Sequence, residues 1–152
     1  MRVTKSALRV LLVTALGLIP LISPLCEVNA SASTFNKSQW ERSSFKHLSS
    51  FQNTYDELSQ AAQDNEISLE YTLAGKIMGE GNGISNLAHT PNSSLNSNLK
   101  LLGKTIYSWG VNVLTLVANF ETNTNTPVST RRMSTQVKTI KLLFKEVTGS
   151  KL

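Results

Sequence analysis

The residues of this 152-residue chain that could do chemistry are few and scattered. The run Gly79-Glu80-Gly81-Asn82-Gly83 resembles a phosphate-cradling loop only superficially, because such loops follow a strand, whereas the residues before this run have a helical pattern. We predict that these glycines end a helix. Glu80 could serve as a lone general acid, but no partner carboxylate is indicated for it.

The two histidines, His47 and His89, give no sign of a metal or catalytic centre. Neither has a carboxylate or a second histidine at the spacing of metal ligands. Serines are plentiful and a Ser-His-Asp triad assembles in space, but no nucleophile-elbow motif is present. We therefore predict no catalytic, cofactor-binding or metal-binding residues and no enzymatic activity. A small helical hydrolase is the least favoured alternative.

The first 30 residues have the composition of a signal peptide. Arg2, Lys5 and Arg9 precede an uncharged run over 11–25, which matches a positive n-region followed by an apolar h-region. Small-residue cleavage sites follow at Ala30 and Ala32. The run is short and twice interrupted by proline, so cleavage is favoured over a membrane anchor. The expected location is secreted or periplasmic.

Residues 31–152 are expected to form a single domain without disulfides. The only cysteine, Cys26, leaves with the leader, and Leu25 before it does not fit a lipid-attachment motif. About 120 residues are enough for one core. The final tripeptide Ser150-Lys151-Leu152 matches a peroxisomal address. We attribute that match to chance, since export would keep the tail from its receptor.

Apolar residues at spacings of three and four predict an all-α fold. The strongest pattern, over 94–121, corresponds to about 42 Å of helix. It places eight side chains on one stripe: Leu95, Leu99, Leu102, Ile106, Trp109, Val113, Leu116 and Phe120. Similar patterns predict helices over 35–63, 66–78 and 129–147, with a loop over 84–91. Short polar connections favour an antiparallel bundle of about four helices.

Two details of packing follow from these helices. Trp109 lies midway along the long stripe and is predicted to be buried, whereas Trp40, near the start of the first helix, is predicted to be more exposed. Gly103 and Gly110 lie beside the apolar stripe, where we expect their small size to let another helix approach closely.

Charge is modest in total and uneven in distribution. Removing three cations and Glu27 with the leader lowers the formal charge from +5 to about +3. That is weak evidence for a polyanionic partner, and we predict no nucleic-acid partner. Acids concentrate over 56–80 and cations over 131–151, which attraction between neighbouring helices would explain.

These observations favour an exported, non-enzymatic helical bundle that binds another protein, as a secreted effector, adaptor or envelope accessory. Because the predicted second helix is shorter than the third, we expect a groove near 84–91. It would be flanked by a cationic face that attracts an acidic target, made of Arg131, Lys138, Lys141 and Lys145. The first alternative is peripheral binding to a membrane or another anionic surface through the basic last helix. Self-association is left open.

Overall fold

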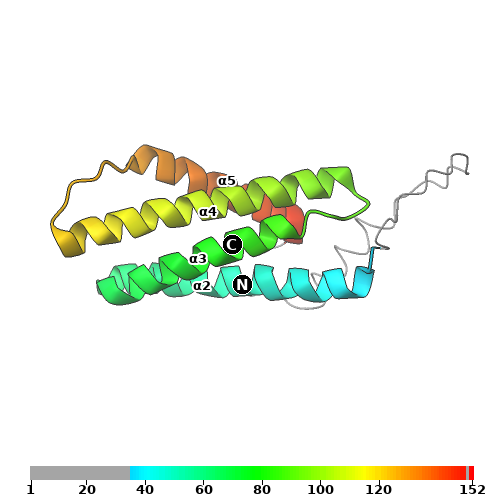
Figure 1. Ribbon diagram of the computed structural model, residues 1–152, viewed down its shortest axis with the longest axis horizontal. Coiled ribbons are helices and arrows are strands. Elements are labelled where there is room, and N and C mark those ends of the chain that lie inside the picture. Colours follow the sequence, from blue (N-terminus) through cyan, green and yellow to red (C-terminus); the bar gives the residue numbers. More distant parts are fainter. Residues whose placement is uncertain (1–34, 150) are drawn as a thin grey trace, which may run out of the picture.

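The computed structural model describes residues 35–149 and 151–152, which form a bundle of four α-helices without a strand. The helices are α2 (Lys37–Asp64), α3 (Ile67–Asn86), α4 (Ser93–Thr122) and α5 (Thr130–Thr148). Figure 1 shows successive helices running in opposite directions. The all-α prediction is confirmed. The expected leader and its cleavage sites lie outside the described residues.

Contacts at the ends of the helices fix this antiparallel order. Trp40 at the start of α2 donates from Nε1 to the Leu87 carbonyl just beyond α3, at 2.7 Å. Asn98 near the start of α4 donates to the Glu146 carboxylate near the end of α5, at 3.3 Å. These contacts place α3 back along α2 and α5 back along α4.

Short polar residues begin and end the helices. Three N-cap side chains accept a hydrogen bond from the backbone N–H three residues further on: Asn36, Asn92 and Ser129. Left-handed residues end three of the helices: Asn65, Asn123 and Gly149. Only Asn65 and Glu66 separate α2 from α3, so the corner between these two helices is tight.

The second helix, α3, is longer than the predicted 66–78 segment. Gly79, Gly81 and Gly83 all lie within it, so the predicted helix-ending turn is wrong. Gly81 is buried against α4, where an added Cβ atom would come within 2.8 Å of the Gly103 carbonyl oxygen. Glycine costs about 1 kcal/mol relative to alanine inside a helix, and close packing of α3 on α4 outweighs that cost. The close approach expected at Gly103 is confirmed.

The connection from α3 to α4 is held in place by hydrogen bonds to the first turn of α4. It begins after Asn86, later than the predicted 84–91 loop. The Thr90 backbone N–H and hydroxyl both lie 2.8 Å from Asn96 Oδ1, and Asn96 Nδ2 donates to the Thr90 carbonyl at 2.7 Å. Thr90 and Leu87 are buried. The groove described below lies between α4 and α5 instead.

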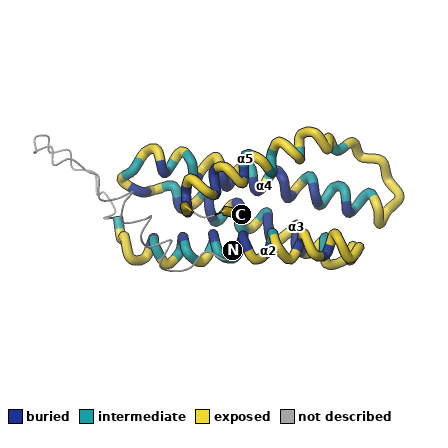
Figure 2. The backbone as a smooth tube through the Cα atoms, turned by 180° about the vertical axis from the view of Figure 1, so that it is seen from behind, coloured by how far each residue is buried: buried dark blue, intermediate teal, exposed yellow. Residues whose placement is uncertain are grey.

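The core follows the predicted stripes, as the inward-facing buried positions in Figure 2 show. Phe51 of α2 meets Phe144 of α5 with ring centroids 5.9 Å apart, which joins the first and last of the four helices. Trp109 is 8% exposed, as predicted. The end of the α4 stripe departs from the prediction, because Leu116 is only half-buried and Phe120 is 76% exposed.

Trp40 is buried as well, with 3% of its surface exposed, so its predicted exposure is wrong. The Phe35 ring lies 6.1 Å from the Trp40 ring between centroids. The α3–α4 connection covers the indole and accepts its N–H through the Leu87 carbonyl. A position near a helix end is therefore part of the core here, because the neighbouring connection folds over it.

Candidate functional site

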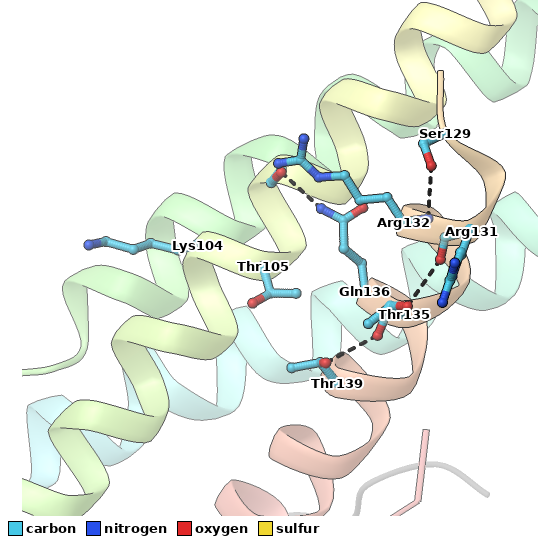
Figure 3. Close-up of a pocket in the computed structure, with 9 residues that line it drawn as sticks. Lys104, Thr105, Ser129, Arg131, Arg132, Thr135, Gln136 and Thr139 are labelled. Carbon is cyan, nitrogen blue, oxygen red and sulfur yellow. Dashed lines mark hydrogen bonds between the residues drawn. The ribbon is translucent and has the colours of Figure 1, made fainter. Parts of the chain in front are cut away.

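A groove of about 590 Å³ lies between α4 and the first half of α5, as Figure 3 shows. Residues on one face of each helix form its walls, at the spacings of three and four that bring helical side chains together. The walls are cationic or polar and contain no carboxylate: Lys104, Thr105, Ser108, Ser129, Arg131, Arg132, Thr135, Gln136 and Thr139. The groove therefore combines positive charge with hydroxyl groups.

Gln136 holds the two walls of the groove together. Its Nε2 donates to the Ser108 hydroxyl and its Oε1 accepts from Asn112 Nδ2, each at 2.9 Å. Ser129 caps the start of α5 by accepting from the Arg132 backbone N–H at 3.2 Å. Because these contacts fix the backbone on both sides, the groove does not have to form when a ligand arrives.

The positive charge of the groove is not neutralised within the described part of the chain. Lys104, Arg131 and Arg132 are exposed, and none of them forms an ion pair with another described residue. The start of α5 adds the positive end of a helix dipole. In Figure 3 the Arg132 side chain reaches across from α5 toward α4. Guanidinium groups donate two parallel hydrogen bonds to a carboxylate, so this site suits an acidic ligand.

The structure separates the four residues predicted to bind a partner. Arg131 lines the groove, whereas the lysines predicted with it are not among the groove residues. Lys141 turns toward α2, with its Nζ 5.9 Å from the centroid of the Tyr55 ring. Lys138 and Lys145 are exposed further along α5. The partner-binding role of these three lysines stays a prediction.

Two groove cations were not singled out from the sequence. Arg132 follows Arg131 directly and belongs to the same helical pattern, so that pattern could have pointed to it. Lys104 lies on a different helix. Only the packing of α4 against α5 brings it to the groove, and nothing in its sequence neighbourhood indicates this.

A second polar cluster joins α2 to α3. His47 Nδ1 lies 2.9 Å from Glu80 Oε2, and the Ser50 hydroxyl donates to Glu80 Oε1 at 2.6 Å. Gly83 lies beneath the imidazole, since a Cβ atom there would overlap the His47 ring. The sequence indicated no partner carboxylate for Glu80, and the partners that the structure gives it are a histidine and a serine. The partners are far apart in sequence, so no spacing rule could have revealed them.

The order of groups in this cluster differs from a hydrolase triad. In a triad the histidine accepts the proton of the serine hydroxyl and the carboxylate orients the histidine. Here the Glu80 carboxylate lies between Ser50 and His47. It accepts a hydrogen bond from the Ser50 hydroxyl, and it also accepts one from His47 when the histidine Nδ1 carries a proton. The acceptor of the Ser50 hydroxyl is therefore a carboxylate and not a histidine, and the two contacts hold α2 against α3.

No protein-family model, curated protein or solved structure matches this chain. Within residues 35–149 and 151–152, no three His, Cys, Asp or Glu side chains gather as a metal site would require. Every helix in the same part of the chain is too short or too polar to span a membrane. The groove between α4 and α5 is the feature with the clearest ligand chemistry.

Proposed function

We propose that the chain is an exported, non-enzymatic helical bundle that binds an acidic segment of another protein in the groove between α4 and α5. The observation that carries this proposal is the convergence of Lys104, Arg131 and Arg132 on a groove without a carboxylate. Each of these cations is exposed and without an ion-pair partner in the described residues. A carboxylate ligand would satisfy them.

The polar walls of the groove suit a peptide. Thr105, Thr135 and Thr139 place hydroxyl groups beside the cations. Each hydroxyl donates to the carbonyl four residues earlier in its own helix, and its oxygen can still accept a hydrogen bond from a peptide N–H. Because Gln136 fixes the two walls of the groove relative to each other, binding would require little ordering of the protein, which favours affinity. Positive charge at the mouth would also accelerate the encounter with an acidic partner.

Binding to a labelled glutamate-rich peptide tests this proposal, with a lysine-rich peptide of the same length as the control ligand. Reversing the groove cations in Lys104→Glu/Arg131→Glu/Arg132→Glu should weaken binding by at least about tenfold, or about 1.4 kcal/mol. The matched variant Lys138→Glu/Lys141→Glu/Lys145→Glu carries the same net charge outside the groove. It should bind nearly as the wild type does.

Two results of this experiment would contradict the proposal. Equal losses of affinity in both variants would mean that peptide binding depends only on the net charge of the protein. A loss confined to the Lys138, Lys141 and Lys145 variant would move the site out of the groove, to the part of α5 that carries these lysines. Circular dichroism of each variant checks that the helices remain formed.

Export is the part of the proposal that rests on the leader sequence. Arg2, Lys5 and Arg9 followed by an uncharged run have the order of a signal peptide. N-terminal sequencing of the extracytoplasmic protein should begin at Ser31 or Ser33. An intact Met1 on protein recovered from inside the cell would contradict export.

Peripheral binding to an anionic surface is the second candidate, and one observation favours it. Leu142 is exposed over 59% of its surface and lies four residues after Lys138 and three before Lys145, on the same face of α5. An exposed apolar residue between cations is typical of helices that lie on membranes. Sedimentation with vesicles containing anionic lipid, compared with neutral vesicles, separates this candidate from the first.

A further inference from the structure

Arg131 and Arg132 are the only two adjacent basic residues in the chain. Two consecutive guanidinium groups match a protease cleft whose neighbouring subsites carry carboxylates, because each guanidinium can donate two parallel hydrogen bonds to one carboxylate. Such a pair lets an endoprotease distinguish this position from the isolated lysines and arginines elsewhere in the chain. The sequence thus provides a recognition element for cleavage after Arg132, provided that the structure makes it accessible.

The pair follows an exposed connection. Residues 123–129 join α4 to α5 outside any helix, and all of them except Val128 are exposed. Figure 2 shows them as an arc at one end of the bundle, continuous with the exposed start of α5. The Asn119 side chain holds the part of the arc nearest to α4, since its Nδ2 donates to the Thr126 carbonyl at 2.8 Å. The residues directly before the pair are therefore open to a protease from solvent.

The first half of α5 packs on the bundle only through partly exposed side chains. None of its residues over 130–139 is buried, and burial begins at Ile140. The hydrogen bonds of Gln136 to α4 come four residues after Arg132. Ahead of them, Ser129 caps the first turn through one hydrogen bond of 3.2 Å. The first turn can therefore unwind without exposing the core, as local openings of weakly packed segments do.

This ease of unwinding separates the pair from the cations inside the other helices. An endoprotease cuts an extended segment, so cleavage within a helix follows the population of locally opened molecules. Lys104 lies within the long helix α4, next to the buried Gly103. Lys76 lies between the buried Ala74 and Ile77 of α3. Opening the chain at either lysine would expose core residues, whereas opening it at the pair would not.

We propose that Arg131-Arg132 is a processing site, at which an extracytoplasmic endoprotease specific for paired basic residues cleaves the chain after Arg132. The reaction is hydrolysis, and water is the co-reactant. The bond between the Arg132 carbonyl carbon and the Met133 nitrogen breaks, the hydroxyl of water joins the carbon, and the remaining proton goes to the nitrogen. Arg132 then ends in a carboxyl group, and Met133 gains a free amino group.

Cleavage would remove the α5 cations from the groove. Arg131 and Arg132 would stay on the fragment that carries α4 but would no longer belong to a helix, and the new carboxylate would repel an acidic ligand. The rest of α5 would keep its core contacts, such as that of Phe144 with Phe51. The inference rests on the proposed function, since it makes cleavage the step that ends the binding of an acidic segment in the groove.

Limited digestion of the purified protein with trypsin tests the accessibility of the site. Trypsin cuts after any lysine or arginine, so the first cut that divides the bundle should follow Arg131 or Arg132. Division should be at least about tenfold slower in Arg131→Gln/Arg132→Gln, because the remaining cations need larger openings. The control Lys138→Gln/Lys141→Gln removes two cations of the same helix and should be divided at the wild-type rate. A first dividing cut within α2, α3 or α4 would overturn the inference.

A subtilisin-like endoprotease specific for paired basic residues tests the recognition of the pair, with Arg131→Gln as the matched variant. This variant keeps Arg132, so trypsin should still divide it, whereas the pair-specific enzyme should not. In the native extracytoplasmic fraction, mass spectrometry should find a fragment that begins at Met133, and cells that express only the Arg131→Gln variant should lack this fragment. Recovery of only the uncut chain ending at Leu152 would overturn the inference.

Peptide binding separates this inference from the proposed function. The cut protein should bind the glutamate-rich peptide at least about tenfold more weakly than the uncut protein, and an excess of the peptide should slow cleavage after Arg132. Uncut protein that is cleaved at the pair but binds no peptide would overturn the proposed function alone. Peptide binding by a protein that is never cleaved in its native compartment would overturn the processing site alone. Equal binding before and after the cut would refute cleavage as the step that ends binding.

Discussion

Gly81 of α3 and Gly103 of α4 lie backbone to backbone. A Cβ atom on Gly81 would come within 2.8 Å of the Gly103 carbonyl oxygen and 2.7 Å of the Tyr107 backbone nitrogen. Neither of those atoms can rotate away as a side chain would. The spacing between the two helices therefore depends on the absence of side chains at these two positions.

Alanine at Gly81 or Gly103 should destabilise the protein. Overpacking a close contact costs about 1–3 kcal/mol, which exceeds the gain in helix propensity. Gly75→Ala and Gly79→Ala are matched controls on α3, because a Cβ atom at either position has nothing within 4 Å. These controls should instead raise the free energy of unfolding by about 0.5–1 kcal/mol. Urea denaturation measures the free energy of unfolding of all four variants. An equal change in that free energy at all four sites would contradict the close contact.

Removing the indole N–H of Trp40 should weaken the bundle. Trp40→Phe removes the indole donor but leaves the Leu87 carbonyl its second donor, the His89 backbone N–H at 2.9 Å, so the loss should be that of one hydrogen bond, about 0.5–1.5 kcal/mol. The variant Trp109→Phe leaves Trp40 as the only tryptophan of the chain. Its fluorescence should resist quenching by acrylamide, since Trp40 is buried. Quenching as strong as that of free tryptophan would show that the α3–α4 connection does not cover this ring.

The contact between Ser50 and Glu80 should be measurable as a coupling energy. Glu80→Gln should lower the free energy of unfolding by about 1 kcal/mol, because a hydrogen bond to a charged group is replaced by a weaker one. In a double-mutant cycle with Ser50→Ala, the two losses should not add. Glu57→Gln, at an exposed position of α2, is the control and should change stability by less than about 0.5 kcal/mol.

The two aromatic residues of the α4 stripe should respond very differently to truncation. Trp109→Ala removes a buried ring and should cost about 3–5 kcal/mol. Phe120→Ala, at a position that is 76% exposed, should change the free energy of unfolding by no more than about 0.5 kcal/mol. Similar losses at both sites would mean that the core extends to the end of α4.

The helices were predictable because their apolar spacing is a local property of the sequence. The end of α3 was not, since Gly79 and Gly83 resemble a terminator when read alone. A continuing signal did exist: Ala74, Ile77, Gly81 and Ile84 keep the spacing of three and four, and all four are buried. Counting Gly81 as an apolar core position would have extended the helix correctly.

The candidate site was less predictable than the fold. The two α5 cations of the groove, Arg131 and Arg132, are adjacent in sequence, so the charge pattern of the predicted last helix was enough to single out Arg131. The contribution of Lys104 depends on the register between α4 and α5, which the Gln136 contacts establish. The burial of Trp40 and the partners of Glu80 likewise depend on segments distant in sequence, and amphipathic periodicity carries no information about such pairings.

The tight corner at Asn65 also has a kinetic consequence. Each helix packs on its neighbour in sequence through a short connection, and only Asn65 and Glu66 join α2 to α3. Chains rich in such local contacts lose little loop-closure entropy before their contacts form, so helical bundles fold within about microseconds to milliseconds. We expect this chain to reach its final structure on that timescale, with little time for partly folded molecules to aggregate.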